Sequence, residues 1–192
     1  MGLIMRDLSL HLMDIIQNSI KAKASRIDIN IIADVKKDKL VIEIKDNGAG
    51  MDEAILGQVR NPFITTRTTR KVGLGIPLLE ASAARSGGEL VIESQKSKGT
   101  LVKANFKISH IDRLPLGDIA ETTMSLIAAN ADVDIFLKLS NMNESFSFSV
   151  PEVKEQLGDV PIDNGDVLIW IRDYINEGVK IIFGGVLNEI LS

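Results

Sequence analysis

The stretch KLVIEIKDNGAGM, residues 39–51, constrains the fold more than any other part of the chain. Its apolar residues alternate, so Leu40, Ile42 and Ile44 lie on one face of a predicted β-strand. Asp46 has the same parity, and its carboxylate should therefore point into the core with them. A buried carboxylate must receive hydrogen bonds from nearby donors. The end of this strand is thus predicted to form a polar site at the edge of a core.

Two interpretations of the glycine turn that follows are open. The pair Asn47-Gly48 is typical of a type I′ hairpin turn. A hairpin turn should lead into another strand, however, whereas residues 51–59 (MDEAILGQV) predict a helix. Gly48 and Gly50 would then let the backbone approach a flat or bulky group closely. The order strand, glycine turn, helix favours this second interpretation.

The surrounding periodicities predict an α+β fold. Helical and alternating segments follow one another, and the strands come in pairs joined by short turns. We expect helices at 7–22, from about residue 52, and from the turn that holds Pro77 to Gly87-Gly88. We expect strands at 26–34, 40–46, 89–94 and 100–108. This order indicates a two-layer α/β sandwich with a mixed or antiparallel sheet.

A break in the pattern falls at residues 109–118 (SHIDRLPLGD). We interpret it as a linker between a domain at 1–108 and a small C-terminal α/β unit at 119–192, which is expected to bind a protein partner. The elements predicted beyond the break are a helix at about 117–130, strands at 133–139 and 145–150, and helices at 151–157 and near 165–177.

Composition excludes several functions. The 192 residues suffice for one domain of ordinary size, and a net charge of −4 argues against nucleic acid as a partner. The chain has no cysteine, so disulfides, thiolate zinc sites and a cysteine nucleophile are excluded within it. No apolar run approaches the length of a membrane span, and no secretory signal is apparent. A cytoplasmic protein without a membrane association is expected.

A second glycine motif precedes the helix that holds Pro77. In VGLGIPLL, residues 72–79, Gly73 and Gly75 stand where the unpaired N–H groups of a helix start could bind phosphate. The motif is neither a dinucleotide fingerprint, which has a third glycine, nor a Walker loop. The preceding TTRTTRK stretch adds Arg67, Arg70 and Lys71, which are either phosphate donors or an ordinary solvated loop. The motif alone does not decide between these alternatives.

A row of polar side chains lies on the first predicted helix. Asp7, His11, Asp14 and Asn18 are spaced by four, three and four residues and share one face. Such a row is commonly a solvent face, and His11 is more often structural than a phosphate acceptor. Asn18 is flanked by isoleucines, however, where an amide is unusual. An amide near phosphates can hold a divalent ion, and a carboxylate one turn away can position water or accept a proton.

The order of these motifs is more informative than any one of them. The sequence contains, in this order, HLMDIIQNSIKA, DNGAGM, NPFITT, VGLGIPLLEAS and SKGTLVKANF. Together they resemble the N, G1, F and G2 boxes and the final Gly-Thr of the GHKL superfamily, which includes gyrase B, Hsp90, MutL and the catalytic domain of histidine kinases. The resemblance covers about residues 5–108. It implies the Bergerat fold, a two-layer α/β sandwich with a mixed sheet that binds ATP and Mg²⁺.

The resemblance also implies roles for individual residues. Asp46 would accept a hydrogen bond from the adenine amino group, with Thr100 assisting through water. The base would be lined by the turn that contains Gly48, Gly50 and Met51. Asn18 would ligate Mg²⁺. The backbone of Gly73, Leu74 and Gly75 would present N–H groups to the phosphates. Phe63, Thr65 and Thr66 would belong to the lid, and Arg67 or Lys71 would lie near the γ-phosphate.

Two departures from the family bear on function. Asp14 stands where ATPase members have Glu, and its shorter side chain puts water activation in question; it is nevertheless the candidate catalytic base. The chain also begins a few residues before its first helix, so we expect no dimerising helix pair with a phosphoacceptor histidine. In this respect the chain resembles stand-alone anti-sigma-factor kinases and small bacterial ATP-binding proteins found beside iron-only hydrogenase subunits.

Three functions follow from the resemblance. The first is a protein kinase that acts in trans on a Ser, Thr or His of a partner. The second is a slow ATPase switch, and the third is a nucleotide sensor without catalysis. The expected partner is a protein, either hydrogenase-associated or like an anti-sigma antagonist, and a homodimer is also considered.

Overall fold

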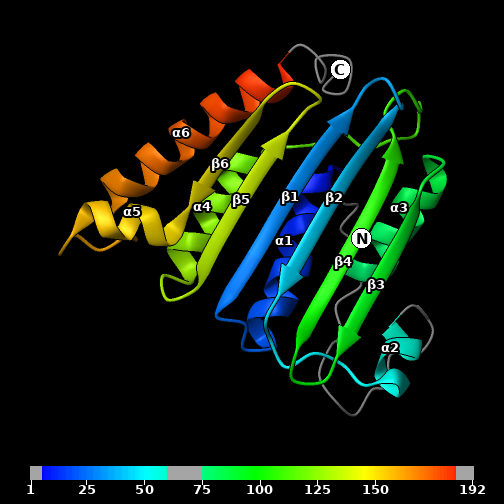
Figure 1. Cartoon of the computed structure of the whole chain (residues 1–192), viewed down its shortest axis with the longest axis horizontal. Helices are drawn as coiled ribbons and strands as arrows, with labels where there is room; N and C mark the ends of the chain where they lie inside the picture. Colours follow the sequence, from blue (N-terminus) through cyan, green and yellow to red (C-terminus); the bar gives the residue numbers. More distant parts are fainter. Residues whose placement is uncertain (1–5, 60–74, 185–192) are drawn as a thin grey trace.

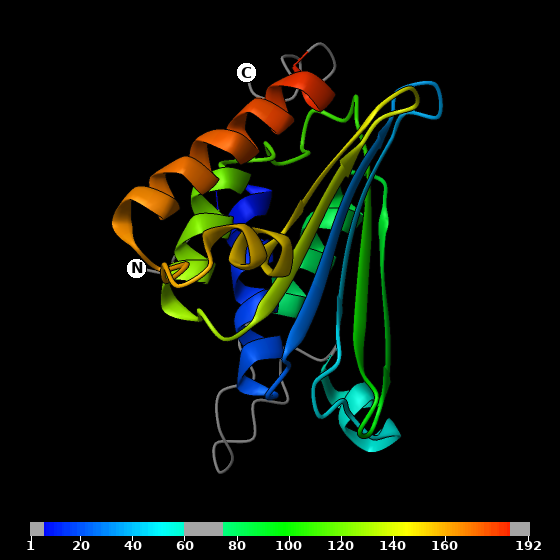
Figure 2. The same cartoon turned by 60° about the vertical axis from the view of Figure 1, so that its left-hand side comes forward.

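The computed structural model describes residues 6–59 and 75–184, which form two layers (Figures 1 and 2). One layer is a six-stranded sheet with the strand order β3-β4-β2-β1-β5-β6. Its strands are β1 (Arg26–Asp34), β2 (Lys39–Asp46), β3 (Glu89–Gln95), β4 (Gly99–Lys107), β5 (Asp134–Ser140) and β6 (Ser145–Ser149). The β1–β5 pairing is parallel and the other four pairings are antiparallel, so the sheet is mixed as predicted.

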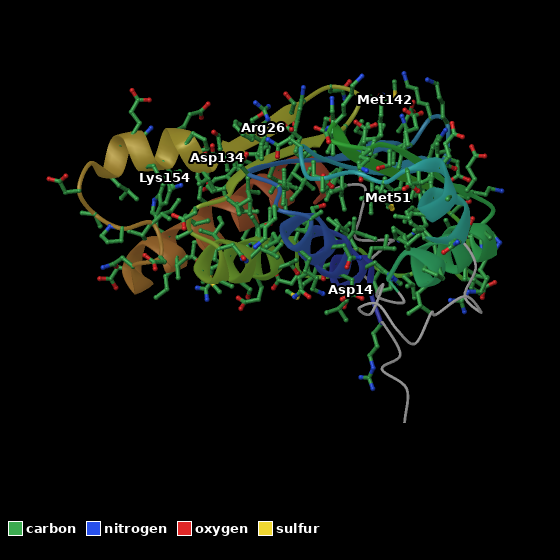
Figure 3. All side chains as sticks on the ribbon, turned by 90° about the horizontal axis from the view of Figure 1, so that it is seen from below. Asp14, Arg26, Met51, Asp134, Met142 and Lys154 are labelled. Carbon is green, nitrogen blue, oxygen red and sulfur yellow. The ribbon has the colours of Figure 1, made fainter. Side chains whose placement is uncertain are left out.

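The other layer consists of helices on one face of this sheet. Figures 1 and 3 show α1, α3 and α4 beneath the strands, with α6 beyond α4. The helices are α1 (Leu8–Lys21), α2 (Glu53–Val59), α3 (Gly75–Arg85), α4 (Ile119–Ala129), α5 (Val150–Leu157) and α6 (Gly165–Phe183). None of the helices in the described part of the chain combines the length and apolarity needed to cross a bilayer.

Alternation along the strands produces the core. On β1 the buried residues are Ile27, Ile29 and Ile31, while Asp28 and Asn30 between them lie on the uncovered face. The same alternation on β2 buries the face that Asp46 shares. The strands at 26–34, 89–94 and 100–108 are confirmed to within a residue. The helix expected at 7–22 begins at Leu8 because Asp7 is its N-cap and accepts a hydrogen bond from the Leu10 N–H.

The C-terminal elements continue the same sheet. After α4 the chain enters β5, which pairs in parallel with β1 from Arg26↔Asp134 onward, and β6 completes the edge. Residues 109–118 contain no helix or strand. They are nevertheless fixed to the first helix, since Leu8 N donates to Pro115 O at 2.9 Å and Ser9 N to Leu116 O at 2.9 Å. The sheet is therefore continuous across the predicted linker.

The last helix is longer than the sequence predicted. We expected it to end near residue 177, but α6 continues to Phe183. Gly178 lies inside this helix, and its missing side chain leaves room for the ring of Phe146, which lies 2.5 Å from where a Cβ would be. The glycine is a packing site here and does not terminate the helix.

Candidate functional site

Asp46, the last residue of β2, forms the floor of a polar site. Its side chain is only 7% exposed. Oδ2 accepts from Ser19 Oγ on α1 at 2.6 Å, and Oδ1 accepts from the Gly48 N–H at 2.8 Å. A carboxylate has about four acceptor positions, so this arrangement fixes the group and leaves it able to accept further bonds. The predicted inward orientation of Asp46 is confirmed.

The glycine turn is not a hairpin, because the chain goes on to α2 instead of a strand. Ala49 N donates to Ala22 O at 2.8 Å, and Ser97 N donates to Ala49 O at 2.7 Å. The turn is thus held between the end of α1 and the β3–β4 turn. Gly50 has φ +62°, and a Cβ there would lie 2.0 Å from Gln95 O. No other residue type fits that position without moving the neighbouring backbone.

A pair of hydroxyl groups flanks Asp46 on the next strands. Thr100 on β4 is its register partner, and its Oγ1 lies 2.9 Å from Ser94 Oγ on β3. Met51 N also donates to Ser94 Oγ, at 2.8 Å. Sequence reasoning missed Ser19 and Ser94. Parity along β3 could have found the second, because Ser94 falls in step with the buried Ile92.

A cavity of about 740 Å³ opens next to this group, a volume within the range of nucleotide and cofactor pockets. Five of the residues predicted to bind the ligand line it: Asn18, Asp46, Gly50, Met51 and Thr100. The remaining lining residues are Ile15, Ser19, Lys21, Ala22, Lys23, Ile55, Val59, Ile76 and Val102. Apolar walls with one buried carboxylate at the floor suit a flat heterocycle that carries an amino group.

Asp14 occupies a different position from Asn18. It lies on α1 (Figure 3), but it is not among the residues that line the cavity. Its side chain packs against the first residue of α3, because a Cβ on Gly75 would lie 2.9 Å from Asp14 Cβ and 3.2 Å from its Oδ2. Gly75 is thus the residue that lets α3 start directly beside α1.

The other residues predicted to bind phosphate lie almost entirely outside the described part of the chain. Residues 60–74 lie outside the described part of the chain, and they include Phe63, Thr65, Thr66, Arg67, Lys71, Gly73 and Leu74. Of the second glycine motif, only Gly75 is described. Two exposed lysines, Lys21 and Lys23, do line the cavity, and they give its rim a positive charge that the sequence analysis did not single out.

His11 is buried and is not among the residues that line the cavity. It is 2% exposed, and its Nδ1 has no hydrogen-bond partner among the described residues. Burial lowers the pKa of His11 below its ordinary value, although the nearby carboxylates of Asp14 and Asp7 act in the opposite direction. The structural role that the sequence favoured for His11 agrees with this burial.

The described residues include no group of three or more His, Asp or Glu side chains placed to hold a metal. The cavity does offer Asn18, and an amide oxygen is a ligand that Mg²⁺ accepts. Bound phosphates and water would have to supply the other ligands, which is the usual way Mg²⁺ is held beside a nucleotide. The residues present therefore fit Mg²⁺ as part of a nucleotide complex.

Fold and site together define a two-layer α/β sandwich with a nucleotide pocket between its first helix and the end of its sheet. Residues 5–110 match the family model described as histidine kinase-, DNA gyrase B-, and HSP90-like ATPase. The match covers more than half of the chain, and the protein belongs to this family. The GHKL resemblance and the Bergerat fold expected from the sequence are confirmed.

Individual relatives support the family assignment. A putative sensor protein of Shewanella frigidimarina is 34% identical over 103 residues, which are 53% of this chain and 16% of that protein. Sensor protein kinase FleS of Pseudomonas aeruginosa is 32% identical over 109 residues, 57% of this chain and 26% of the kinase. The chain thus spans only 16% and 26% of the length of these two relatives.

Solved structures support the fold. The N-terminal domain of a DNA repair protein superposes with a TM-score of 0.51 at 16% identity, over 76% of this chain and 53% of that one. At this identity the likeness shows a shared architecture.

Proposed function

We propose that the protein binds Mg·ATP in the Asp46 cavity and acts as a protein kinase in trans on a Ser, Thr or His of a partner. The observation that carries the proposal is the buried Asp46 carboxylate, fixed by Ser19 and Gly48 and directed at a cavity that Asn18 also lines. The family supplies the class of ligand. The kinases among its relatives supply the class of reaction.

The proposed recognition of the base rests on donor and acceptor chemistry. An ionised carboxylate only accepts hydrogen bonds, so Asp46 suits the 6-amino group of adenine and disfavours the 6-oxo group of guanine. Thr100 lies opposite Asp46 across the β2–β4 pair and can hold a bridging water. The apolar walls made by Ile15, Met51 and Ile76 suit the faces of the ring.

The proposed phosphate end lies where α1 meets the start of α3. The N–H groups and the positive dipole end at the start of α3 favour anions, and Lys21 adds a cation at the cavity rim. Mg²⁺ would neutralise phosphate charge during transfer, with Asn18 as its protein ligand. Within the protein, catalysis would consist of positioning and electrostatic stabilisation.

The position of Asp14 bears on the choice between a kinase, an ATPase switch and a nucleotide sensor. A general base for a substrate hydroxyl should face the nucleotide, yet Asp14 packs on Gly75 outside the set of cavity-lining residues. A slow ATPase switch would need Asp14 near the nucleotide as well, so this position favours a second candidate, a nucleotide sensor without catalysis that controls a partner. In that case the Asp14–Gly75 contact would couple nucleotide binding in the cavity to the position of α3.

Incubation with γ-³²P-ATP, with and without cell extract, tests these functions. A labelled protein in the extract supports the kinase, released phosphate supports the ATPase, and nucleotide binding without either supports the sensor. Asp46→Asn should strongly lower each signal at limiting ATP, because it weakens ATP binding. Asp132→Asn serves as a matched control, because it makes the same change at an exposed turn just before β5 and does not line the cavity. Label transfer that is equal in both variants would refute a role for the Asp46 cavity.

A further inference from the structure

The outer face of α6 carries an unusual set of exposed side chains. Ile169, Trp170, Tyr174 and Ile181 are 50, 49, 40 and 59% exposed. Their spacing places them on one side of the helix, opposite the buried Ile171 and Ile175, which pack toward α4 and the sheet. Single exposed apolar residues are common, but four on one helical face form a patch of the kind that marks a binding surface.

The aromatic part of this patch is preorganised. The chain has one tryptophan and one tyrosine, and both are here. Their rings stack with centroids 5.2 Å apart at an interplanar angle of 6°. Tyr174 also contacts Phe146 of β6, at 5.0 Å between centroids, and Phe146 is itself seated against Gly178. The two exposed rings are thus held in place, which limits the entropy lost on binding.

The same face is acidic. Asp166, Asp173 and Glu177 are exposed and alternate along it with the apolar residues, whereas Lys180 is its one exposed base. Arg172 bridges to Asp173 at 2.9 Å, but both side chains remain open to solvent. Aromatic anchors surrounded by carboxylates favour a ligand that is apolar and cationic at once.

Charge is divided unequally along the whole chain. Residues 117–192 contain 13 acidic and four basic side chains, a net charge of −9. Residues 1–116 contain 18 basic and 13 acidic side chains, a net charge of +5, and the two parts together give −4. The acidity of the α6 face is therefore part of a larger negative region that contrasts with the rest of the molecule.

We propose that the outer face of α6, defined by Asp166, Ile169, Trp170, Asp173, Tyr174, Glu177 and Ile181, docks a basic amphipathic segment of another protein. The segment inserts apolar side chains beside the aromatic stack and pairs its Lys or Arg residues with the three carboxylates. An Arg guanidinium can also stack on the open face of Trp170.

Charge decides against other occupants. Nucleic acid and anionic membrane surfaces are repelled by this face. A second copy joined by a two-fold axis would bring the acidic faces together, because such an interface uses the same patch on both chains. A positively charged amphipathic protein segment complements both the exposed apolar side chains and the carboxylates of this surface.

Trp170 provides the test, because tryptophan emission in this protein comes from the proposed surface alone. An 18-residue helical peptide of Leu and Lys is titrated into the full chain at low salt, and a peptide with Glu in place of Lys is titrated in parallel. We expect a saturable blue shift of Trp170 emission with the Lys peptide, weaker at higher salt. The Glu peptide should cause no shift. Relative to how each ion quenches free tryptophan amide, caesium should quench Trp170 more strongly than iodide does, because the surrounding carboxylates attract cations.

Two sets of variants locate the contact. Asp166→Asn/Asp173→Asn/Glu177→Gln should weaken binding of the Lys peptide roughly tenfold, the effect expected for several exposed charge pairs. The control Asp132→Asn/Asp159→Asn/Glu155→Gln removes the same charges from exposed positions elsewhere in the C-terminal part and should leave binding within about twofold. Tyr174→Ala should weaken binding more than Tyr174→Phe, as judged by anisotropy of a labelled peptide.

Several results would overturn the proposal. They are the absence of any response to the Lys peptide, equal responses to both peptides, or equal losses in the test and control triple variants. Concentration-dependent self-association that Tyr174→Ala abolishes would assign the face to a second copy instead. None of these outcomes depends on whether the Asp46 cavity binds ATP.

Discussion

At the scale of single residues, Asp46 is the most sharply defined functional group. Replacing it with Asn preserves size but exchanges an acceptor for a mixed donor and acceptor. We expect Asp46→Asn to weaken ATP binding by about 1.5–3 kcal/mol, the worth of a hydrogen bond to a charged group. Calorimetry with ATP and GTP measures this, and GTP should bind the wild type less tightly than ATP. Equal ATP affinity of the two proteins would exclude Asp46 as the base acceptor.

Substitutions of Asp14 test whether this residue takes part in catalysis. If Asp14 acts as a base, Asp14→Asn should leave nucleotide affinity nearly unchanged and lower turnover by roughly 10²–10⁴. Asp14→Glu should raise ATP hydrolysis without a partner, because the longer side chain reaches farther from α1. Single-turnover rates at saturating Mg·ATP compare the three proteins. Identical rates would remove Asp14 from the chemistry and favour the nucleotide sensor.

His11 makes stability depend on pH. Its pKa is lowered by burial in the folded protein, so the unfolded chain binds a proton more readily. The free energy of unfolding should therefore fall as the pH drops below about 6.5, by at most about 1.4 kcal/mol per pH unit. Urea unfolding at pH 7.5 and 5.5 measures the slope. His11→Leu should reduce this slope, and an unchanged slope in His11→Leu would contradict the assignment.

These residues also show how much of the site could be predicted from the sequence. Parity along β2 predicted the inward carboxylate, because alternation is a property of the local backbone. The donor from Ser19 to Asp46 was not predicted, because it joins positions 27 residues apart and depends on how α1 lies on the sheet. The position of Asp14 on Gly75 was missed for the same reason. Helical spacing placed Asp14 and Asn18 on one face without showing which of them meets the cavity.

At the scale of elements, α6 is longer than predicted and contains Gly178 in its interior. In an open helix, Gly→Ala stabilises by about 1 kcal/mol. Gly178→Ala should instead destabilise the protein, because its Cβ would overlap the Phe146 ring. Gly165→Ala at the start of the same helix is the matched control, since nothing lies within 4 Å of its Cβ position. Urea unfolding compares the two variants, and a gain in stability from Gly178→Ala would disprove the packing role.

The course of α6 also explains why its end was predicted too early. Glycine is a common signal of helix termination, and the local sequence does not reveal a ring from another strand. Only the pairing of β5 with β6 brings Phe146 to this helix. Elements with a strong period were predicted to within a residue or two, whereas the boundary that depends on tertiary packing was not.

At the scale of the whole molecule, the continuous sheet predicts how the protein unfolds. β5 is paired along its length with β1, so the C-terminal part covers an edge that the first part would otherwise expose. Segment 109–118 looked like a linker because it lacks periodicity, and sequence alone does not show that the next strand, β5, adds to the same sheet beside β1. We therefore expect one cooperative transition instead of two.

Trp170 makes this expectation measurable, because its fluorescence reports the C-terminal part while far-UV circular dichroism reports the whole chain. The two urea unfolding curves should coincide in midpoint and slope, as a two-state transition requires. Lys138→Pro, which puts a residue without an N–H in the strand between β1 and β6, should lower both midpoints together. Lys36→Pro, at an exposed position in the turn between β1 and β2, is the control for the Lys-to-Pro change. A fluorescence transition at lower urea than the dichroism transition would show instead that residues 119–192 unfold as a separate unit.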